Sequence, residues 1–373
     1  MGLNRIRLGD YITRSTTNNH NLQYGMDLIT GVTSEGVFAT PKGDPIDVDL
    51  KPYKIVNNGA FVYNPTRIDL GSIAYRTEGL CIVSHLYIIF YLNEKGKKTI
   101  NPLWLYIYFR RDEFRREVRF RNFGSQRPEF SFNDMSDIEV PLPDLPTQNK
   151  FVDIYNAMVA NQQSYESGLE DLKLSIDAVL DKIKHSSSMV SVRDCLKEVD
   201  VRNENGAITN VQGINILKQF MPSVADTNGV NLSNYKVVQN GQFAYSGMQT
   251  GRDECIRIAR YRGENPIIIS PAYTVFECKY NAVLPDYIMM WFSRAECDRR
   301  GWFMSDSSIR TNLDLDRFYE IRIPVPDTPM QKSVVELYSV YIERRKINER
   351  LKSQIKDICP ILIKGSLEEG KNA

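Results

Sequence analysis

Apolar side chains recur at alternating intervals of four and three residues in two distant parts of the chain. This spacing is typical of long helices that pack on each other along a seam. It predicts two such helices, over residues 144–186 and 327–373, the second with a slip of phase near Arg344. The positions expected at the helix–helix interface are Phe151, Tyr155, Met158, Tyr165, Leu169, Leu172, Ile176, Val179, Ile183, Val334, Tyr338, Tyr341, Leu351, Ile355, Ile358 and Leu362.

A seam of this length must be covered, and two arrangements would cover it. The two helices can pack antiparallel within one chain, which leaves room for a whole domain between them. Alternatively, each helix can pair in parallel with its own copy in a homodimer. We expect the antiparallel pair within one chain, because it needs no second copy.

The chain contains an internal repeat. The phrase "IEVPLPDLPTQ" at 138–148 returns as "IRIPVPDTPMQ" at 321–331, an offset of 321 − 138 = 183 residues. At nearly the same offset "YKIVNNGAFVYN" (53–64) is matched by "YKVVQNGQFAYS" (235–246). Matches in the same order along most of the length indicate a duplication. Each copy of the phrase stands where a long helix is expected to begin, with Pro at the first position of the helix and Asp just upstream.

The segments before the two helices have a mixed pattern. Short runs rich in β-branched and aromatic residues, such as "CIVSHLYIIFYL" at 81–92, alternate with Gly, Asn and Pro turns and with one helical stretch. The predicted fold is α+β, with two related globular domains and an approximate two-fold axis. The expected division is 1–143 (first domain), 144–186 (first helix), 187–326 (second domain) and 327–373 (second helix).

Composition narrows the class of protein. Hydrophobic residues make up 42% and charged residues 25% of the 373, as in soluble globular proteins. The six cysteines and three histidines are scattered, which predicts buried thiols, no metal site and a reducing cytoplasm.

The net charge of the chain is only +1, so any binding to nucleic acid must use a local patch. Residues 110–127 hold such a patch, with seven arginines against three acidic residues. A solvated helix face with ion pairs would give the same pattern.

Several phrases carry a resemblance to a known family. "IEVPLPDLPTQ", "IRIPVPDTPMQ", "YNPTRIDLGSIA" (63–74) and "IIISPAYTVF" (267–276) look like parts of type I restriction–modification specificity subunits. The resemblance extends over essentially the whole chain, as two target-recognition domains that alternate with two helical spacers. It implies a sequence-specific DNA-binding subunit without catalytic activity. Each domain would recognise one half of an asymmetric bipartite site, and the helices would set the distance between the halves.

The resemblance also implies partners and cofactors. Two methyltransferase (modification) subunits would bind this chain, use S-adenosylmethionine and methylate adenine. Restriction and translocase subunits, which use ATP and Mg²⁺, would join for cleavage. No cofactor is expected in this chain itself, and no membrane contact.

Catalytic motifs are incomplete in this sequence. "YLNEKGKKT" at 91–99 lacks the first glycine and the final Ser/Thr of a phosphate-binding loop. "YNPT" (63–66) and "INPL" (100–103) lack the second proline and the aromatic of an amino-methyltransferase loop. "GDPIDVDLK" at 43–51 contains Asp44, Asp49 and Lys51, a spacing found in metal-dependent nucleases but also common in turns. A stand-alone nuclease and a helical scaffold that only assembles proteins remain as alternatives.

The candidate DNA-binding residues come from segments that correspond across the repeat. Long polar side chains can read base edges, while arginines on phosphates set affinity. The polar turn at 64–72 corresponds to 246–254, and the segment 124–130 corresponds to 306–312. The arginine-rich stretch 110–121 is expected to hold phosphate more strongly than its less basic counterpart 293–304. The residues selected are Arg67, Arg115, Arg116, Arg119, Ser125, Gln126, Arg127, Gln249, Thr250, Arg252, Ser308 and Arg310.

Overall fold

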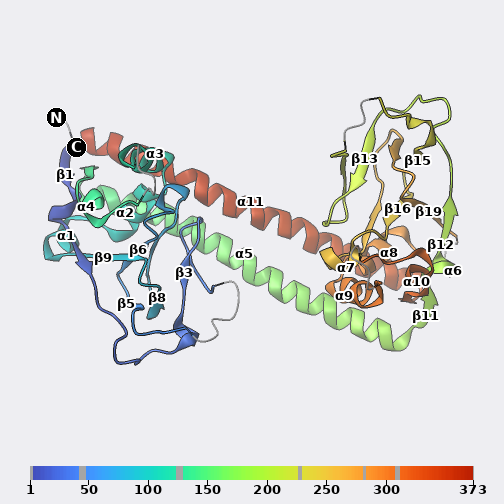
Figure 1. Ribbon diagram of the computed structural model, residues 1–373, viewed down its shortest axis with the longest axis horizontal. Helices are drawn as coiled ribbons and strands as arrows, with labels where there is room; N and C mark the ends of the chain where they lie inside the picture. Colours follow the sequence, from blue (N-terminus) through green and yellow to red (C-terminus); the bar gives the residue numbers. More distant parts are fainter. Residues whose placement is uncertain are drawn as a thin grey trace. The chain divides into compact units, whose positions relative to one another are not determined.

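The chain folds into two compact units. The computed structural model describes residues 3–41, 48–122, 129–225, 229–279, 283–306 and 311–372 (Figure 1). Unit 1 comprises Met1–Glu166 and Ile347–Ala373, and unit 2 comprises Ser167–Lys346. Each long helix therefore contributes one part to each unit.

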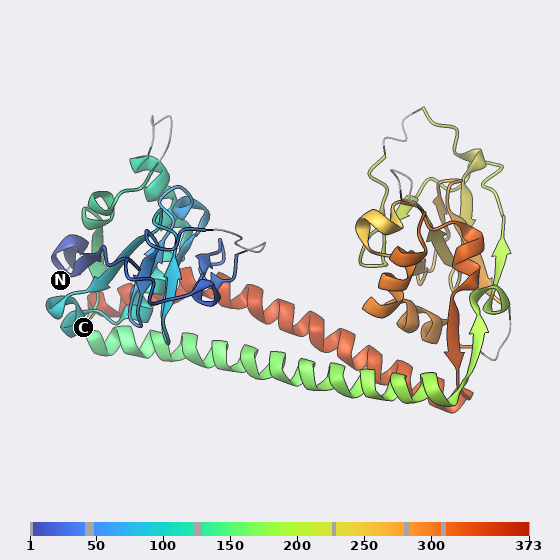
Figure 2. The same ribbon diagram turned by 60° about the horizontal axis from the view of Figure 1, so that its bottom comes forward.

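Unit 1 is built around a four-stranded antiparallel sheet with strand order β2-β9-β6-β7 (Figure 2). These strands are β2 (Ile12–Ser15), β9 (Ile88–Leu92), β6 (Phe61–Tyr63) and β7 (Ile73–Tyr75). Three further antiparallel pairs are β1 (Asn4–Arg7) with β10 (Glu139–Leu142), β3 (Gly31–Val32) with β4 (Phe38–Ala39), and β5 (Lys54–Val56) with β8 (Cys81–Val83). The helices are α1 (Glu94–Thr99), α2 (Pro102–Phe109), α3 (Asp112–Arg121) and α4 (Phe132–Ser136).

The core of unit 1 joins the sheet to its helices through aromatic rings. Phe61 and Phe90 stack with centroids 5.0 Å apart, and the ring of Phe109 from α2 meets Phe61 edge-on at 6.0 Å. Trp104 of α2 is fully buried and donates from Nε1 to Ser366 Oγ at 3.0 Å. Large buried aromatic surfaces contribute strongly to stability. They fix α2 between the sheet and the C-terminal helix.

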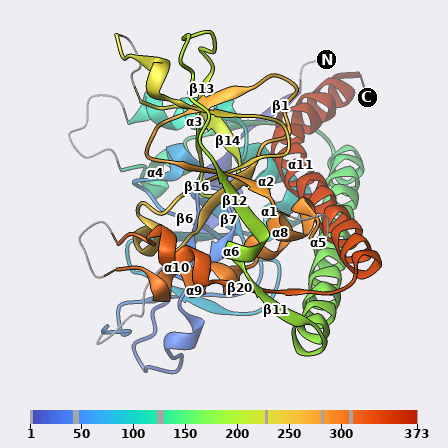
Figure 3. The ribbon, with the colours of Figure 1, turned by 90° about the vertical axis from the view of Figure 1, so that its right-hand side faces the viewer.

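Unit 2 contains two four-stranded sheets. The first has the order β12-β19-β16-β17, from β12 (Leu196–Val199), β19 (Thr274–Cys278), β16 (Phe243–Ser246) and β17 (Arg257–Arg260). The second has the order β14-β13-β18-β15, from β14 (Phe220–Pro222), β13 (Val211–Ile214), β18 (Ile267–Ile269) and β15 (Lys236–Val238). β11 (Ser188–Ser191) follows α5 and pairs antiparallel with β20 (Arg322–Val325) (Figure 3). The helices are α6 (Val192–Cys195), α7 (Thr250–Asp253), α8 (Pro285–Phe292), α9 (Ala295–Met304) and α10 (Leu315–Glu320).

The two predicted long helices are present, and the mixed α and β content is confirmed. α5 runs from Leu145 to Ser186 and α11 from Thr328 to Asn372. Asp144 Oδ1 accepts from the backbone N–H of Thr147 at 3.1 Å, and Asp327 Oδ1 accepts from that of Met330 at 2.9 Å. These carboxylates satisfy N–H groups that a helix leaves unpaired at its start. The repeated phrase therefore marks the start of each helix.

The last residue of the repeated phrase is a buried glutamine in both units. Gln148 Nε2 donates to the carbonyl oxygen of Pro143 at 2.8 Å, and its Oε1 accepts from the backbone N–H of Asn101, just before α2, at 2.8 Å. Gln331 makes the equivalent contacts in unit 2. Its Nε2 donates to the carbonyl oxygen of Pro326 at 2.9 Å, and its Oε1 accepts from the backbone N–H of Leu284, just before α8, at 2.8 Å. Each glutamine thus ties the start of a long helix to the start of a core helix.

Within unit 1 the two long helices run antiparallel. Lys150 pairs with Glu369 at 2.8 Å, whereas Glu166, further along α5, pairs with Lys352 at 2.6 Å, earlier in α11. Within unit 2, Leu172 and Val179 of α5 and Tyr338 and Tyr341 of α11 pack against one hydrophobic core. All sixteen positions expected at the interface are buried or partly buried.

The six cysteines are free thiols, as predicted. Five are buried and Cys278 is partly buried. Burial raises the pKa of Cys195 to about 11 and that of Cys297 to about 12. Thiols with such pKa values are protonated and unreactive at neutral pH.

Candidate nucleic-acid interface

The arginine-rich segment of unit 1 divides into buried and exposed members. Arg110 is buried and donates from Nη1 to the carbonyl oxygen of Gly71 at 2.7 Å. The side chain of Arg115 is only 17% exposed and pairs with Asp112 at 3.3 Å. The turn contains Gly71, whose φ is +101°. A Cβ atom added at Gly71 would lie 2.5 Å from the carbonyl oxygen of Ser34 and 2.9 Å from Arg115 Nη2. Arg110 and Arg115 are therefore packed beside this turn, and Arg115, which we expected to contact phosphate, has a structural position instead.

Arg116 and Arg119 are exposed but have acidic neighbours. Arg116 pairs with Glu113 at 3.1 Å, and Arg119 Nε lies 3.4 Å from Asp69 Oδ2. Exposed ion pairs of this kind contribute little free energy. Both side chains can therefore exchange their partners for phosphate groups.

Arg67 is an exposed predicted contact of unit 1 on a fixed stretch of backbone. It precedes the short 3₁₀ helix η3 (Ile68–Leu70), and its backbone carbonyl accepts from the N–H groups of Leu70 and Ser72. The side chain is exposed and makes no hydrogen bond or ion pair with any residue that the structure describes. A fixed backbone with a free guanidinium is suited to contact a base edge or a phosphate.

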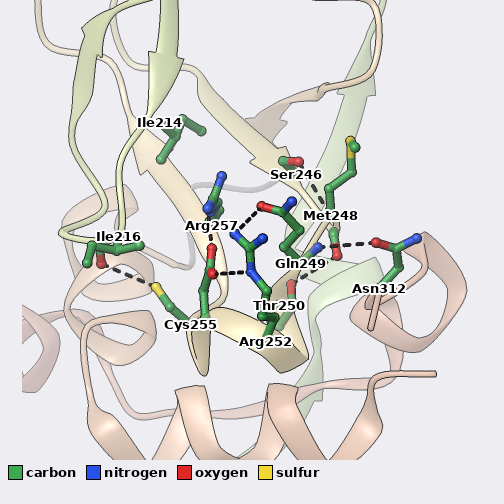
Figure 4. Close-up of polar contacts among 12 residues, drawn as sticks. Ile214, Ile216, Ser246, Met248, Gln249, Thr250, Arg252, Cys255, Arg257 and Asn312 are labelled. Carbon is green, nitrogen blue, oxygen red and sulfur yellow. Dashed lines mark hydrogen bonds and ion pairs between the residues drawn. The ribbon is translucent and has the colours of Figure 1, made fainter. Parts of the chain in front are cut away.

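In unit 2 the predicted turn is a short helix that is firmly attached to a neighbouring segment (Figure 4). The N–H of Leu313 donates to the carbonyl oxygen of Gly247, and the N–H of Gly251 donates to that of Thr311, both at 2.9 Å. The N–H of Gln249 donates to Asn312 Oδ1 at 3.2 Å. A Cβ at residue 251 would lie 2.7 Å from Thr311 Cβ, so glycine is needed for this close approach. The side chains of α7 are therefore presented from a rigid support.

Gln249 and Arg252 form an exposed polar pair on this support. Arg252 Nη2 donates to Gln249 Oε1 at 2.8 Å. Gln249 has φ +61°, a left-handed conformation that costs a residue other than glycine about 1 kcal/mol or more. Such conformations are concentrated at binding sites, where the surrounding structure holds them in place. The pair can present donors and acceptors together, as recognition of a base edge requires.

Thr250 does not match its predicted role. Its side chain is fully buried, and Oγ1 donates to the carbonyl oxygen of Gly247 at 3.1 Å. A buried hydroxyl that is already satisfied cannot contact a base. Thr250 is a structural residue that closes the first turn of α7, and its assignment as a DNA contact is wrong for this conformation.

Asp253 connects the exposed pair to the sheet. It pairs with Arg252 Nε at 3.0 Å and with Arg257 of β17. Burial alone would raise the pKa of Asp253, but hydrogen bonds from Arg252 and Arg257 outweigh it and lower the pKa below its usual value. The carboxylate is therefore charged at neutral pH and orients the Arg252 guanidinium.

The other predicted DNA contacts cannot be placed. Ser125, Gln126, Arg127, Ser308 and Arg310 lie outside the described residues. They remain predictions from the sequence.

Unit 2 has two exposed cations that were not among the predicted contacts. Arg299 and Arg300 of α9 are exposed and make no ion pair with a described acidic residue. Their segment was judged less basic because Glu296 and Asp298 lie close in sequence. Glu296 instead pairs with Lys184 and Arg294. Asp298 pairs with Lys218. Only the three-dimensional pairing shows that Arg299 and Arg300 are available.

The residues that resembled a nuclease constellation form a turn where they are described. Asp49 Oδ1 accepts from the backbone N–H of Lys51 at 3.0 Å, while Asp44 lies outside the described residues. Across the part of the chain that the structure describes, no group of three or more His, Cys, Asp or Glu side chains could hold a metal ion. The D-x-K spacing is explained by a local side-chain-to-backbone turn.

Comparison with protein families identifies one stretch of the chain. Residues 9–171 match the family model described as "Type I restriction modification DNA specificity domain". This stretch is therefore a domain of that kind. No curated protein matched the sequence.

Solved structures share the fold over almost the whole chain. A type I restriction–modification S subunit from M. genitalium superposes with a TM-score of 0.58 at 12% identity, and covers 98% of this chain and 96% of its own. A chain from a structural study of complex assembly and conformational transition in a type I system has a TM-score of 0.52 at 13% identity, over 98% and 97% of the two chains. No helix among the described residues is long and apolar enough to cross a membrane.

Proposed function

We propose that this chain is a DNA specificity subunit whose two units read the two different halves of an asymmetric bipartite DNA site. Support comes from the family match over residues 9–171 and from the strand order of the units. Unit 1 has β2-β9-β6-β7 beside the pair β1–β10, and unit 2 has β12-β19-β16-β17 beside the pair β11–β20. A main sheet of the same strand order that carries different exposed side chains is what two recognition domains for two different half-sites require.

The duplication proposed from the sequence is part of this function. We take 1–143 and 187–326 as recognition domains, and 144–186 and 327–373 as helical spacers, related by an approximate two-fold axis. B-DNA has a local two-fold symmetry that such a protein can match. The equivalent roles of Gln148 and Gln331 at the starts of the helices support this division. The spacers would set the distance between half-sites.

The chemistry of the complex is proposed to lie in partner subunits. Two methyltransferase subunits would dock on this chain and use S-adenosylmethionine, and translocase subunits would use ATP and Mg²⁺ for restriction. The chain itself then needs no cofactor and works as a non-catalytic subunit. Because the DNA that it would bind is chromosomal or invading DNA, its proposed place is the cytoplasm.

Among the described residues, the proposed DNA contacts are Arg67, Arg116 and Arg119 in unit 1 and Gln249, Arg252, Arg299 and Arg300 in unit 2. Arg67 and the Gln249–Arg252 pair would read base edges, because they combine exposure with a fixed backbone. The two pairs Arg116 and Arg119, and Arg299 and Arg300, would hold phosphates.

The test is selection of DNA from a random pool by the complete complex with its methyltransferase subunits. The expected result is an enriched motif of two half-sites at a fixed spacing. Replacing residues 1–143 by another recognition domain should change one half-site and leave the other intact. A pool without enrichment would indicate a scaffold role, and a simultaneous change of both half-sites would contradict the division into two readers.

A further inference from the structure

Two phenylalanines are strongly exposed at equivalent places in the two units. Phe120 lies in the last turn of α3 and is 82% exposed, and Phe303 lies in the last turn of α9 and is 85% exposed. Their separation, 303 − 120 = 183 residues, equals that of the repeated phrase. Phenylalanine is usually buried in folded proteins. Exposure of the same residue type at the same position of both units therefore needs an explanation.

The helices that carry them share a pattern of buried and exposed positions. One turn before each phenylalanine stands an exposed arginine, Arg116 in α3 and Arg299 in α9, again 183 residues apart. The side of each helix that faces the core is also equivalent, with Phe114 and Val118 buried in α3 and Cys297 and Gly301 buried in α9. Residues four apart lie on the same face of a helix. Each unit thus presents one face that combines a cation with an aromatic ring.

We propose that Phe120 and Phe303 are a matched pair of DNA contacts that each place a ring against the bases of one half-site and disturb base stacking there. This inference rests on the proposed function, that each unit binds one half of the site. The accompanying arginine holds the adjacent phosphate. Apolar side chains that enter a base step and cationic side chains on the flanking phosphates are a recurring combination in proteins that deform DNA.

Residues that differ between the two units and residues that are the same in both can have different roles in DNA binding. Side chains that read different half-sites must differ between the units, and at the turn they do, with Arg67 in one and the Gln249–Arg252 pair in the other. A stacked base step and its phosphates are common to every half-site, so a contact with them can be the same in both units. The arginine beside each phenylalanine favours DNA as the occupant over an apolar protein surface, because its charge complements phosphate.

The experiment uses the complex assembled with its methyltransferase subunits and a duplex of the selected site with 2-aminopurine at successive positions. The variants are F120A, F303A and F120W, with L86A and V224A as controls because Leu86 and Val224 are also exposed apolar side chains. We expect F120A and F303A each to weaken specific binding by about tenfold, as loss of one aromatic that stacks on a base does. Each should abolish the 2-aminopurine fluorescence increase in one half-site only. F120W should retain both properties.

Two outcomes would overturn the inference while the bipartite motif of the wild-type complex still upholds the proposed function. One is wild-type affinity and wild-type fluorescence for both alanine variants. The other is loss of methyltransferase subunits from the purified complex, with unchanged affinity of the remaining assembly for DNA, which would make the phenylalanines protein contacts. Thermal unfolding of each variant checks the fold, and no change is expected because both side chains are exposed.

Discussion

The side-chain amide of Gln162 in α5 donates a hydrogen bond of 3.0 Å to Asn348 Oδ1 in α11, and both residues are buried between the two helices in unit 1. Gln162 Nε2 also donates to Glu166 Oε2 at 2.9 Å. Lys352 Nζ donates to Glu166 Oε1 at 2.6 Å and so joins the same cluster of polar side chains. A buried polar layer reduces stability relative to apolar packing, but it fixes the register of the two helices. A slip by one turn would leave these groups buried without partners.

The first prediction concerns this polar layer. N348L should destabilise the protein by about 1–3 kcal/mol, because the Gln162 amide loses a buried partner. The double variant Q162L/N348L should recover most of this loss, since neither polar group remains. Urea unfolding measures both effects. Equal losses for the single and double variants would show that the two side chains are not coupled. On the proposed function, the double variant should also accept DNA sites with altered spacing.

The second prediction concerns a buried ion pair in unit 2. The Lys218 and Asp298 side chains are 7% and 19% exposed and lie in contact at 2.5 Å, which ties the turn after β13 to α9. K218M should lower the free energy of unfolding by about 3–5 kcal/mol, because the buried carboxylate of Asp298 loses its counter-charge. K197M, which breaks the exposed pair of Lys197 with Glu277, is the control and should cost about 1 kcal/mol or less. Similar losses for the two variants in urea unfolding would contradict the structural role of Lys218.

The third prediction concerns pH. The folded-state pKa of Asp253 lies below its usual value of 3.8, owing to hydrogen bonds from Arg252 and Arg257 that outweigh burial. Its stabilisation is therefore present above about pH 4 and is lost as the pH falls through the folded-state pKa. D253N should be about 1 kcal/mol less stable than wild type at pH 7. The difference should shrink toward pH 3, and a difference independent of pH would argue against the charged pair.

The fourth prediction concerns salt dependence of DNA binding. R299A/R300A should lower the slope of log affinity against log salt by about 2, because two phosphate contacts are lost at about 0.9 each. R116A/R119A should have a smaller effect, since Arg116 and Arg119 must first leave Glu113 and Asp69. This order is the opposite of the sequence-based expectation that the first domain holds phosphate more strongly. Salt titration of the complete complex on its selected site decides between them.

The sequence indicated some of the candidate DNA contacts and not others. Arg67, Gln249 and Arg252 were selected because polar turns correspond across the repeat; all three are at least partly exposed, and their contact with DNA stays a prediction. Thr250 is buried and the side chain of Arg115 is mostly buried, and a short polar segment does not reveal which side chain turns inward. Phe120 and Phe303 were not selected from the sequence, since an aromatic in a helix is usually part of the core. Their exposure appears only once Phe114 and Cys297 are seen to occupy the buried positions of α3 and α9.

The two long helices, the places where they begin and the mixed class follow from the sequence, because periodicity, capping and β-rich runs are local properties of neighbouring residues. Asp144 and Asp327 could be assigned in this way. Which charges are neutralised and which polar groups are buried depends instead on the folded chain. Arg119 meets Asp69 from 50 residues away, Gln162 meets Asn348 from 186 residues away, and each glutamine of the repeated phrase bonds to a backbone N–H before another helix. Such pairings depend on distances in space, which no pattern along the chain encodes.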